Sequence, residues 1–395
     1  MKKVVLAYSG GLDTSYCAKY LSDDMGFEVH AVSINTGGFT DEQIKNIEKN
    51  AYALGVKSYK SIKAISMFYQ KVVKYLIFGN VLKNNTYPLS VSAERIIQAI
   101  EIVGHAKKIG AEYIAHGSTG AGNDQVRFDM IFQILAPEIN IITPIRDLKL
   151  SRESEIDYLT NKGISIPWNK AQYSINKGLW GTSVGGKETL TSNLPLPDEA
   201  YPSQLEKQGS EKVKLSFEKG ELMAIDYVKR HPEKNIEILN DMASKYAIGR
   251  DIHVGDTIIG IKGRVGFEAA APLIIIKAHH LLEKHVLTKW QQHHKEYLAN
   301  WYGTMLHEGN YLDEVMRNIE AFLIDSQNNV NGDVMVTLHP FRFTLDGVMS
   351  PNDLMNTSVA AYGEMNTGWT ADDAKGFIKI LSNQNKIYNQ VNKTS

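Results

Sequence analysis

Short apolar runs alternate with amphipathic segments over roughly the first 165 residues of the chain. Unbroken apolar runs of this length are typical of buried strands, and apolar residues that recur at intervals of three and four are typical of helices. The strands are expected at residues 4–8, 29–35, 113–116 and 139–143, and the helices at 14–20, 40–54, 62–78, 92–109 and 151–162. Such alternation predicts a doubly wound α/β domain, a parallel sheet with helices on both faces, which we place at residues 1–168.

The pattern changes after Pro167. Residues 213–217 and 221–226 flank a Lys-Gly pair and predict a hairpin, and Pro232 is expected to open a helix. We further expect a strand at 256–262, a long helix at 275–297 and paired strands within 334–345, interrupted by Pro340. This mixed order predicts a second, α+β domain at residues 169–368.

A final helix is expected from Thr370, within a C-terminal segment at residues 369–395. Phe377, Ile378 and Leu381 form an apolar face on this helix. Such a face either packs on its own chain or contacts another subunit, and we favour an oligomer contact.

The most informative stretch is residues 7–15, which read Ala-Tyr-Ser-Gly-Gly-Leu-Asp-Thr-Ser directly after the first apolar run. Glycines let backbone N–H groups approach an anion, and the start of the following helix favours negative charge. Asp13 would repel a phosphate there unless a cation lay between them, so we interpret the loop as a site for Mg²⁺-pyrophosphate. An ordinary strand–turn–helix connection is the alternative. The loop lacks the Gly-Lys-Ser/Thr of a Walker loop and the third glycine of a dinucleotide fingerprint, and it resembles the pyrophosphate loop of ATP pyrophosphatases.

A second glycine-rich segment reads Ala-His-Gly-Ser-Thr-Gly-Ala-Gly-Asn-Asp-Gln-Val-Arg-Phe-Asp at residues 115–129. It too follows a predicted strand and precedes a predicted helix. Asn123, Asp124 and Arg127 present an amide, a carboxylate and a guanidinium together, a set that suits the ammonium and carboxylate of an amino acid. The alternative is a capped helix with an i,i+3 pair between Asp124 and Arg127.

Composition narrows the classes of function. The chain has 395 residues, 43% of them hydrophobic, and a net charge of −1, so no basic surface for nucleic acid is expected. The single cysteine, Cys17, excludes internal disulfides and is compatible with the reducing cytoplasm. The most apolar run, residues 269–276, is too short to span a membrane.

Together, residues 7–15, Tyr87 with Ser92, and residues 117–127 resemble the argininosuccinate synthase family, most strongly in the first 185 residues. The resemblance implies a nucleotide-binding α/β domain, a synthetase domain and a C-terminal helix that helps to build a homotetramer. It also implies that ATP and Mg²⁺ are used to join citrulline to aspartate through a citrullyl-AMP intermediate, with release of AMP and pyrophosphate.

The resemblance also implies a role for individual residues. ATP would be bound by Ala7, Tyr8, Ser9, Gly10, Gly11, Leu12, Asp13, Thr14, Ser15, Ile34 and Gly117. Aspartate would be bound by Thr119, Asn123 and Asp124. Citrulline would be bound by Tyr87, which we place on a loop, and by Ser92, Asn123, Arg127, Ser174 and Ser183. We identify Asp13, Asp124 and Arg127 as the candidate catalytic residues and Asp13 as the candidate Mg²⁺ ligand.

Two positions depart from the family pattern. Phe267 stands where the family usually has a tyrosine that contacts citrulline, and Gly255 stands where it usually has a glutamate. Removing a hydrogen bond to a charged group costs roughly 1.5–3 kcal/mol. Either Glu268 or Asp256 supplies the missing carboxylate, or the pocket accepts a differently substituted citrulline.

Other functions remain as alternatives. An RNA-modifying pyrophosphatase-loop enzyme would need a basic surface and usually catalytic cysteines. A non-catalytic nucleotide-binding regulator would not need the pocket for an amino-acid substrate that Asp124 and Arg127 indicate. The histidines at 279, 280, 293 and 294 are expected to lie on a solvated helix face rather than to bind metal, since no cysteine or carboxylate completes a zinc pattern.

Overall fold

The computed structural model describes residues 1–164, 173–356, 362–363 and 368–393. The chain forms two compact units, Met1–Pro351 and Asn352–Ser395. The boundary that we place after residue 168 lies outside the described residues, so this division remains a prediction.

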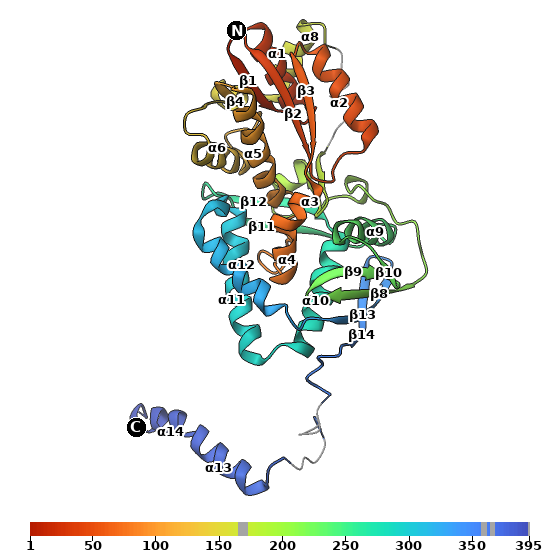
Figure 1. Cartoon of the computed structure of the whole chain (residues 1–395), viewed down its shortest axis with the longest axis vertical. Helices are drawn as coiled ribbons and strands as arrows, with labels where there is room; N and C mark the ends of the chain where they lie inside the picture. The colour runs from red at the N-terminus through yellow and green to blue at the C-terminus, as the bar shows by residue number, and fades with distance from the viewer. Residues whose placement is uncertain (165–172, 357–361, 364–367, 394–395) are drawn as a thin grey trace. The chain divides into compact units, whose positions relative to one another are not determined.

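The N-terminal part of the first unit contains the expected parallel sheet (Figure 1). Its strand order is β3-β2-β1-β4-β5, and every neighbouring pair is parallel. The strands are β1 (Lys3–Ala7), β2 (Glu28–Asn35), β3 (Ser58–Lys63), β4 (Tyr113–Ala115) and β5 (Asn140–Ile142). The helices that follow them are α1 (Leu12–Asp23), α2 (Asp41–Ala53), α5 (Ser90–Ile109), α6 (Asp124–Leu135), α7 (Pro144–Asp147) and α8 (Arg152–Asn161).

Helices cover both faces of this sheet, as expected. Val4 and Leu6 of β1 pack in one apolar cluster with residues of α1, α2 and α8. Val5 points to the opposite face and packs in another cluster with residues of α5 and α6. The predicted caps are confirmed, since Thr40 and Gln43 form a capping box and Ser151 caps α8. The fold class predicted from the apolar pattern is therefore confirmed.

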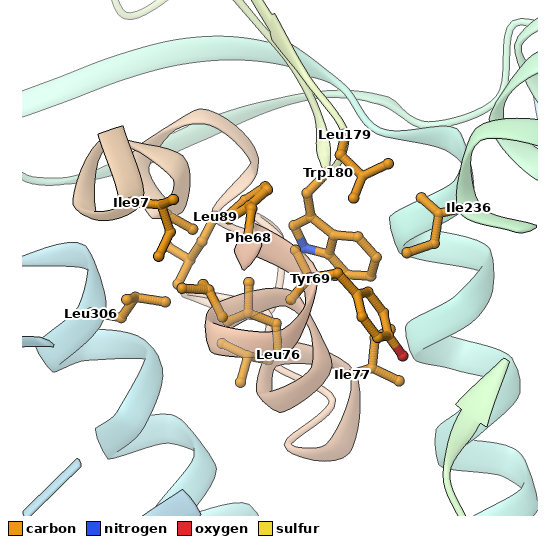
Figure 2. Close-up of a cluster of buried hydrophobic side chains, with 14 of the residues drawn as sticks. Phe68, Tyr69, Leu76, Ile77, Leu89, Ile97, Leu179, Trp180, Ile236 and Leu306 are labelled. Carbon is orange, nitrogen blue, oxygen red and sulfur yellow. The ribbon is translucent and has the colours of Figure 1, made fainter. Parts of the chain in front are cut away.

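The helix expected at 62–78 begins later than predicted and is broken. Ile62 lies in β3, paired with Ile34 of β2. The chain then forms α3 (Ile65–Phe68), a π-helical turn η1 (Tyr69–Val73) and α4 (Lys74–Phe78). The apolar residues of these turns are buried against α5, α9, α11 and the residues around Trp180 (Figure 2).

Two antiparallel sheets form the remainder of the first unit. One has the order β10-β9-β8-β13-β14, with β8 (Glu211–Glu218), β9 (Glu221–Ile225), β10 (Val228–Lys229), β13 (Gly332–His339) and β14 (Arg342–Met349). The other has the order β11-β12-β7-β6, with β6 (Ser174–Gly178), β7 (Gly181–Gly185), β11 (Arg250–Asp256) and β12 (Lys262–Glu268). The helices are α9 (Pro232–Ser244), α10 (Ala270–Val286), α11 (Lys289–His307) and α12 (Glu314–Ser326), and η3 (Lys187–Leu190), η4 (Asp198–Ala200) and η5 (Asn310–Leu312) are single 3₁₀ turns.

The hairpin of β8 and β9, the helix opened by Pro232 and the pair β13 and β14 are confirmed. The strand expected at 256–262 is wrong, because Asp256 ends β11, Lys262 begins β12 and a turn lies between them. The long helix expected at 275–297 is also wrong. It is two helices, because Thr288 caps α11 through a capping box with Gln291.

One of the four histidines is not solvated. His279 is fully buried, and its two ring nitrogens lie 2.6 Å from Asn80 Oδ1 and 2.8 Å from Gln327 Oε1. Glu283 and Lys295, whose carboxylate and amine lie 2.8 Å apart, complete this buried polar network. The pair of hydrogen bonds gives His279 a structural role inside the second half of the unit.

The second unit contains the predicted final helix as α13 (Ala371–Leu381), capped by Thr370, followed by α14 (Asn383–Val391). Phe377, Ile378 and Leu381 are exposed on α13. Among the described residues, no helix combines the length and the apolar character that crossing a lipid bilayer requires.

Candidate functional site

The two glycine-rich loops meet at one edge of the parallel sheet. They follow β1 and β4, which are neighbours, and the carboxyl ends of neighbouring parallel strands lie at the same edge. The strand order reverses between β1 and β4, and ligands of open α/β sheets bind at such a point. Gly117 lies so close to the first loop that a Cβ there would be 3.2 Å from Asp13 Cβ. The geometry therefore brings together the two constellations found in the sequence.

The first loop presents the start of α1 to this edge. Gly10 has a φ of +78°, which favours glycine, and α1 begins at Leu12, slightly earlier than predicted. Gly11 precedes the helix without a side-chain cap, so the first N–H groups of α1 are available to an anion. Ser9 and Thr14 lie beside them with hydroxyl oxygens 3.2 Å apart. This arrangement supports the phosphate interpretation.

The other predicted ATP residues surround this loop. Ala7 ends β1, and Tyr8 is buried with its carbonyl oxygen accepting a hydrogen bond from the Ser33 hydroxyl at 2.6 Å. Ile34 lies near the end of β2 and is also buried. These three residues reach the same sheet edge because they stand at the ends of adjacent strands.

Asp13 lies beside a second carboxyl group that the sequence did not indicate. Glu155 of α8 is buried, and its Oε2 has no hydrogen-bond partner among the described residues. Burial raises the pKa of Glu155 to about 8, and the neighbouring Asp13 adds to the rise. The described residues contain no group of three or more potential metal ligands. A carboxylate next to an anion site fits Mg²⁺, which usually takes one or two carboxylates and completes its shell with phosphate oxygens and water.

The second loop is fixed by hydrogen bonds at both of its ends. The buried His116 ring lies 2.8 Å from Asp129 Oδ1 through Nε2, and its Nδ1 accepts from the Ser118 N–H at 3.2 Å. Gln125 donates to the Gly120 carbonyl at 2.6 Å. Thr119 is exposed between these anchors. The loop therefore presents Thr119 to solvent between two hydrogen-bonded ends.

Asp124 and Arg127 form the ion pair that the spacing allowed, within a larger network. Asp124 accepts from Arg127 at 2.7 Å and from Arg95 of α5 at 2.9 Å. Burial opposes ionisation, but the two guanidinium groups lower the pKa of Asp124 to about 2. The carboxylate is about one-third exposed, so it can still meet a ligand while it remains ionised.

Arg127 also contacts the second half of the unit. Its Nε donates to the carbonyl oxygen of His307, at the end of α11, at 2.9 Å. The His307 ring lies 3.3 Å from the Arg127 guanidinium and 3.5 Å from the Ser92 hydroxyl. Burial and Arg127 lower the pKa of His307 to about 3, so its ring is neutral at pH 7. His307 is not among the site residues predicted from the sequence, because no motif around residue 307 indicates a contact with residue 127.

Asn123 makes a further connection across the unit. Its side-chain oxygen accepts from the backbone N–H of Ile258 at 2.9 Å. Ile258 lies in the turn between β11 and β12, where the apolar pattern predicts a strand. The turn thus positions the edge of the four-stranded sheet against the second loop.

The remaining predicted citrulline residues lie on or next to that sheet. Ser183 of β7 stands directly opposite Phe267 of β12, and Ser174 lies exposed on β6. Tyr87 precedes α5 as predicted but is buried, and its ring lies 5.3 Å from that of Phe267. Ser92 is buried in the first turn of α5. The structure therefore brings Tyr87 and Ser183 together through Phe267.

Neither Glu268 nor Asp256, the two candidates to replace the missing glutamate, lies on the sheet face that carries Phe267 and Ser183. Glu268 follows Phe267 and points to the opposite face of the sheet, where its carboxylate accepts from the Ser203 N–H at 3.3 Å. Asp256 is exposed and pairs with Lys262 at 2.6 Å. The expectation that one of them supplies a carboxylate beside Tyr87 is therefore wrong.

A pH-dependent stability difference is expected for Glu94→Gln. Glu94 accepts from the Thr36 hydroxyl at 2.6 Å and contacts Arg95 at 3.0 Å. Burial raises its pKa to about 7 from the ordinary 4.5, although Arg95 opposes the rise. Between these values the unfolded chain loses its proton first, so the free energy of unfolding falls as pH rises, in total by on the order of 3 kcal/mol.

Glutamine does not titrate, so the stability of the Glu94→Gln variant relative to the wild-type protein should increase from about pH 4.5 to about pH 7 and then level off. Urea unfolding of both proteins across this range measures the difference. A difference that does not change with pH would contradict the raised pKa of Glu94.

Comparison with known proteins identifies the family. Residues 3–165 match the family model described as "Arginosuccinate synthase N-terminal HUP domain", and residues 173–388 match "Arginosuccinate synthase C-terminal domain". Argininosuccinate synthase of Methanocaldococcus jannaschii is 37% identical over 363 residues, covering 91% of each chain. The enzyme of Dictyoglomus turgidum is 37% identical over 390 residues, covering 98% of this chain and 97% of that one. On these matches over nearly its full length, the chain belongs to the argininosuccinate synthase family.

Proposed function

We propose that this chain ligates L-citrulline to L-aspartate at the expense of ATP, forms argininosuccinate and releases AMP and pyrophosphate, as a step of arginine biosynthesis. The observation that carries the proposal is the meeting of the two loops, with Gly117 against Asp13 and the ion pair of Asp124 and Arg127 beside them. One loop suits a pyrophosphate group and the other suits amino acids. A non-catalytic regulator would not need both.

The chemistry follows from holding three substrates in order. The ureido oxygen of citrulline attacks the α-phosphorus, and the bond from that phosphorus to the pyrophosphate oxygen breaks. The aspartate amine then attacks the ureido carbon of citrullyl-AMP, and AMP leaves with the former ureido oxygen. Positioning and charge stabilisation can supply most of the rate in such displacements.

The first loop is proposed to hold the leaving pyrophosphate on the N–H groups at the start of α1. Asp13 would hold Mg²⁺, which neutralises phosphate charge when bound. The Ser9 and Thr14 hydroxyls, 3.2 Å apart, add donors to the same site. Gly117 carries no side chain and so lets the second loop approach Asp13 closely.

The acceptor substrates are proposed to bind beyond the second loop. Thr119, Asn123 and Asp124 would bind aspartate, and the ionised Asp124 suits its ammonium. Arg127 is fixed by Asp124 and His307 and would present its guanidinium to citrulline. The other residues proposed for citrulline are Tyr87, Ser92, Asn123, Ser174 and Ser183.

Assembly, location and partners are also proposals. The exposed apolar residues of α13 support a contact with other subunits, and we propose a homotetramer. The single cysteine, buried Cys17, is compatible with a cytoplasmic location. The net charge of −1 favours small-molecule substrates over nucleic acid or a membrane surface. The proposed division remains 1–168, 169–368 and 369–395.

The first test is the release of pyrophosphate from Mg²⁺-ATP with citrulline and aspartate together and with each omitted in turn. Sustained release that needs both, with argininosuccinate as product, is expected. A full mixture that gives neither pyrophosphate nor argininosuccinate would refute the proposal. The same assay with Nα-acetylcitrulline tests the alternative substrate, and a reaction with free citrulline alone would exclude it.

A further inference from the structure

His253 lies at the centre of the group that contains Tyr87 and Phe267. It is in the middle of β11, and its backbone position places it on the same sheet face as Phe267 and Ser183. Its ring stacks on Tyr87 with centroids 5.1 Å apart and planes at 24°. His253 is therefore in direct contact with a residue proposed to bind citrulline.

The His253 ring has a polar atom that the fold does not use. The side chain is only 6% exposed, and Nδ1 is buried without a hydrogen-bond partner among the described residues. An unpaired buried nitrogen of this kind costs stability unless something binds it. A purely structural partner for the Tyr87 ring could be apolar, like Phe267, whose ring lies 5.3 Å from that of Tyr87.

Gly255 explains how the imidazole fits. A Cβ at residue 255 would lie 2.7 Å from His253 Nε2 and 3.3 Å from the Asn84 amide nitrogen. Asn84 is fixed in turn by its hydrogen bond to the Val254 carbonyl at 3.1 Å. A side chain at 255 and the His253 ring therefore compete for the same space, and in this chain the ring occupies it.

The charges nearby make the imidazole the natural acceptor. Burial and the positive charge of Lys83 both lower the pKa of His253, so that one ring nitrogen carries a lone pair at pH 7. The carboxylate of Asp124 is already bound by Arg95 and Arg127. Glu268 and Asp256 point to the opposite face of this sheet. Asp251 stands opposite Phe267 but is exposed, and its Oδ1 accepts from the Ile252 N–H at 2.7 Å. His253 is therefore the buried acceptor that contacts Tyr87.

We propose that His253 is a specificity-determining residue of the citrulline site, where its imidazole accepts a hydrogen bond from the α-nitrogen of the substrate. The proposal rests on the proposed function and names the group that recognises one end of one substrate. Gly255 provides the space for this group, and Tyr87 orients it by stacking.

The test compares two variants on two substrates. His253→Phe keeps a ring against Tyr87 and removes the acceptor, and His253→Asn keeps a polar group without the ring. The substrates are citrulline and 5-ureidopentanoate, which is citrulline without its α-amino group. The protein used is the full chain, with ATP, Mg²⁺ and aspartate in excess.

For the wild-type protein, loss of the α-amino group is expected to lower kcat/KM by roughly 10- to 100-fold. His253→Phe should lower kcat/KM for citrulline by a similar factor but change kcat/KM for 5-ureidopentanoate by less than about threefold. The variant lacks the acceptor and the analogue lacks the donor of the same hydrogen bond, so the second change removes nothing more. The KM values for ATP and aspartate should not change, and His253→Asn should recover part of the loss with citrulline.

Equal losses on both substrates in His253→Phe, at an unchanged melting temperature, would overturn the proposal, since His253 would then act only through packing on Tyr87. A wild-type protein that makes no argininosuccinate from citrulline would refute the proposed function instead. If His253→Phe does not fold, His253→Leu, which also removes the acceptor, decides by the same comparison of the two substrates.

Discussion

Replacement of Asp124 by asparagine is expected to reduce kcat/KM for aspartate by at least two orders of magnitude. Asp124 accepts charged hydrogen bonds from Arg127 at 2.7 Å and from Arg95 at 2.9 Å. An amide has the same size but offers one acceptor and no charge, so it leaves one guanidinium unpaired and gives the aspartate ammonium no counter-ion. Each lost hydrogen bond to a charged group costs roughly 1.5–3 kcal/mol, and two such losses correspond to about a hundredfold or more.

Steady-state kinetics with saturating ATP and citrulline measure this effect. Glu138→Gln is a matched control, because Glu138 lies in the same half of the unit and pairs with Lys107 at 3.5 Å but is more than half exposed. The control should retain activity within about threefold, as is usual for an exposed ion pair. An Asp124→Asn enzyme with activity within tenfold of wild type would show that the network only supports the fold.

The sequence predicted the site best where the signals are local. Each glycine-rich loop follows an apolar strand and precedes a helix, and all of this is visible within about fifteen residues. That the loops meet follows from parallel strands, whose carboxyl ends share one edge. The pairing of Asp124 with Arg127 is predicted by their i,i+3 spacing on a helix.

The parts that the sequence did not reveal depend on long-range contacts. His307 reaches Arg127 from the end of α11, and His253 reaches Tyr87 from the edge strand of the four-stranded sheet. Neither histidine has a pattern around it that distinguishes it from a core residue. Arg95 had a weak signal, since it lies one helical turn after Ser92 on the same face of α5.

Two wrong boundaries have different causes. Thr288 and Gln291 have the same spacing as Thr40 and Gln43, so the start of α11 could have been predicted from its capping box. The turn between β11 and β12 was harder, because Ile258, Ile259 and Ile261 give it the composition of a strand. Its Thr257 closes the turn by accepting the Ile261 N–H at 3.0 Å, which composition does not reveal.

Replacement of Gly38 by alanine is expected to destabilise the protein by about 3 kcal/mol, the upper end of the usual cost of overpacking, and to lower its activity. Gly38 lies in the loop after β2, and a Cβ there would clash with the carbonyl oxygen of Lys177 in β6. The backbone must move, because the obstacle is main chain rather than a flexible side chain. The same loop is held to the turn after β6 by the Leu179 N–H, which donates to the Thr36 carbonyl at 2.9 Å.

The loss of activity follows from what this contact joins. The strand before Gly38 carries Ile34 of the proposed ATP site, and the strand it touches carries Ser174 of the proposed citrulline site. A shift between them separates two substrates that must react, and a displacement of about 1 Å can cost roughly a hundredfold in rate.

Gly104→Ala is the matched control, because a Cβ at residue 104 of α5 meets nothing within 4 Å. Alanine there should leave activity unchanged and stabilise the helix by about 0.5–1 kcal/mol. Thermal unfolding and the pyrophosphate assay measure the stability and the activity of both variants. A Gly38→Ala protein as stable and active as Gly104→Ala would show that the loop after β2 and strand β6 need not approach so closely.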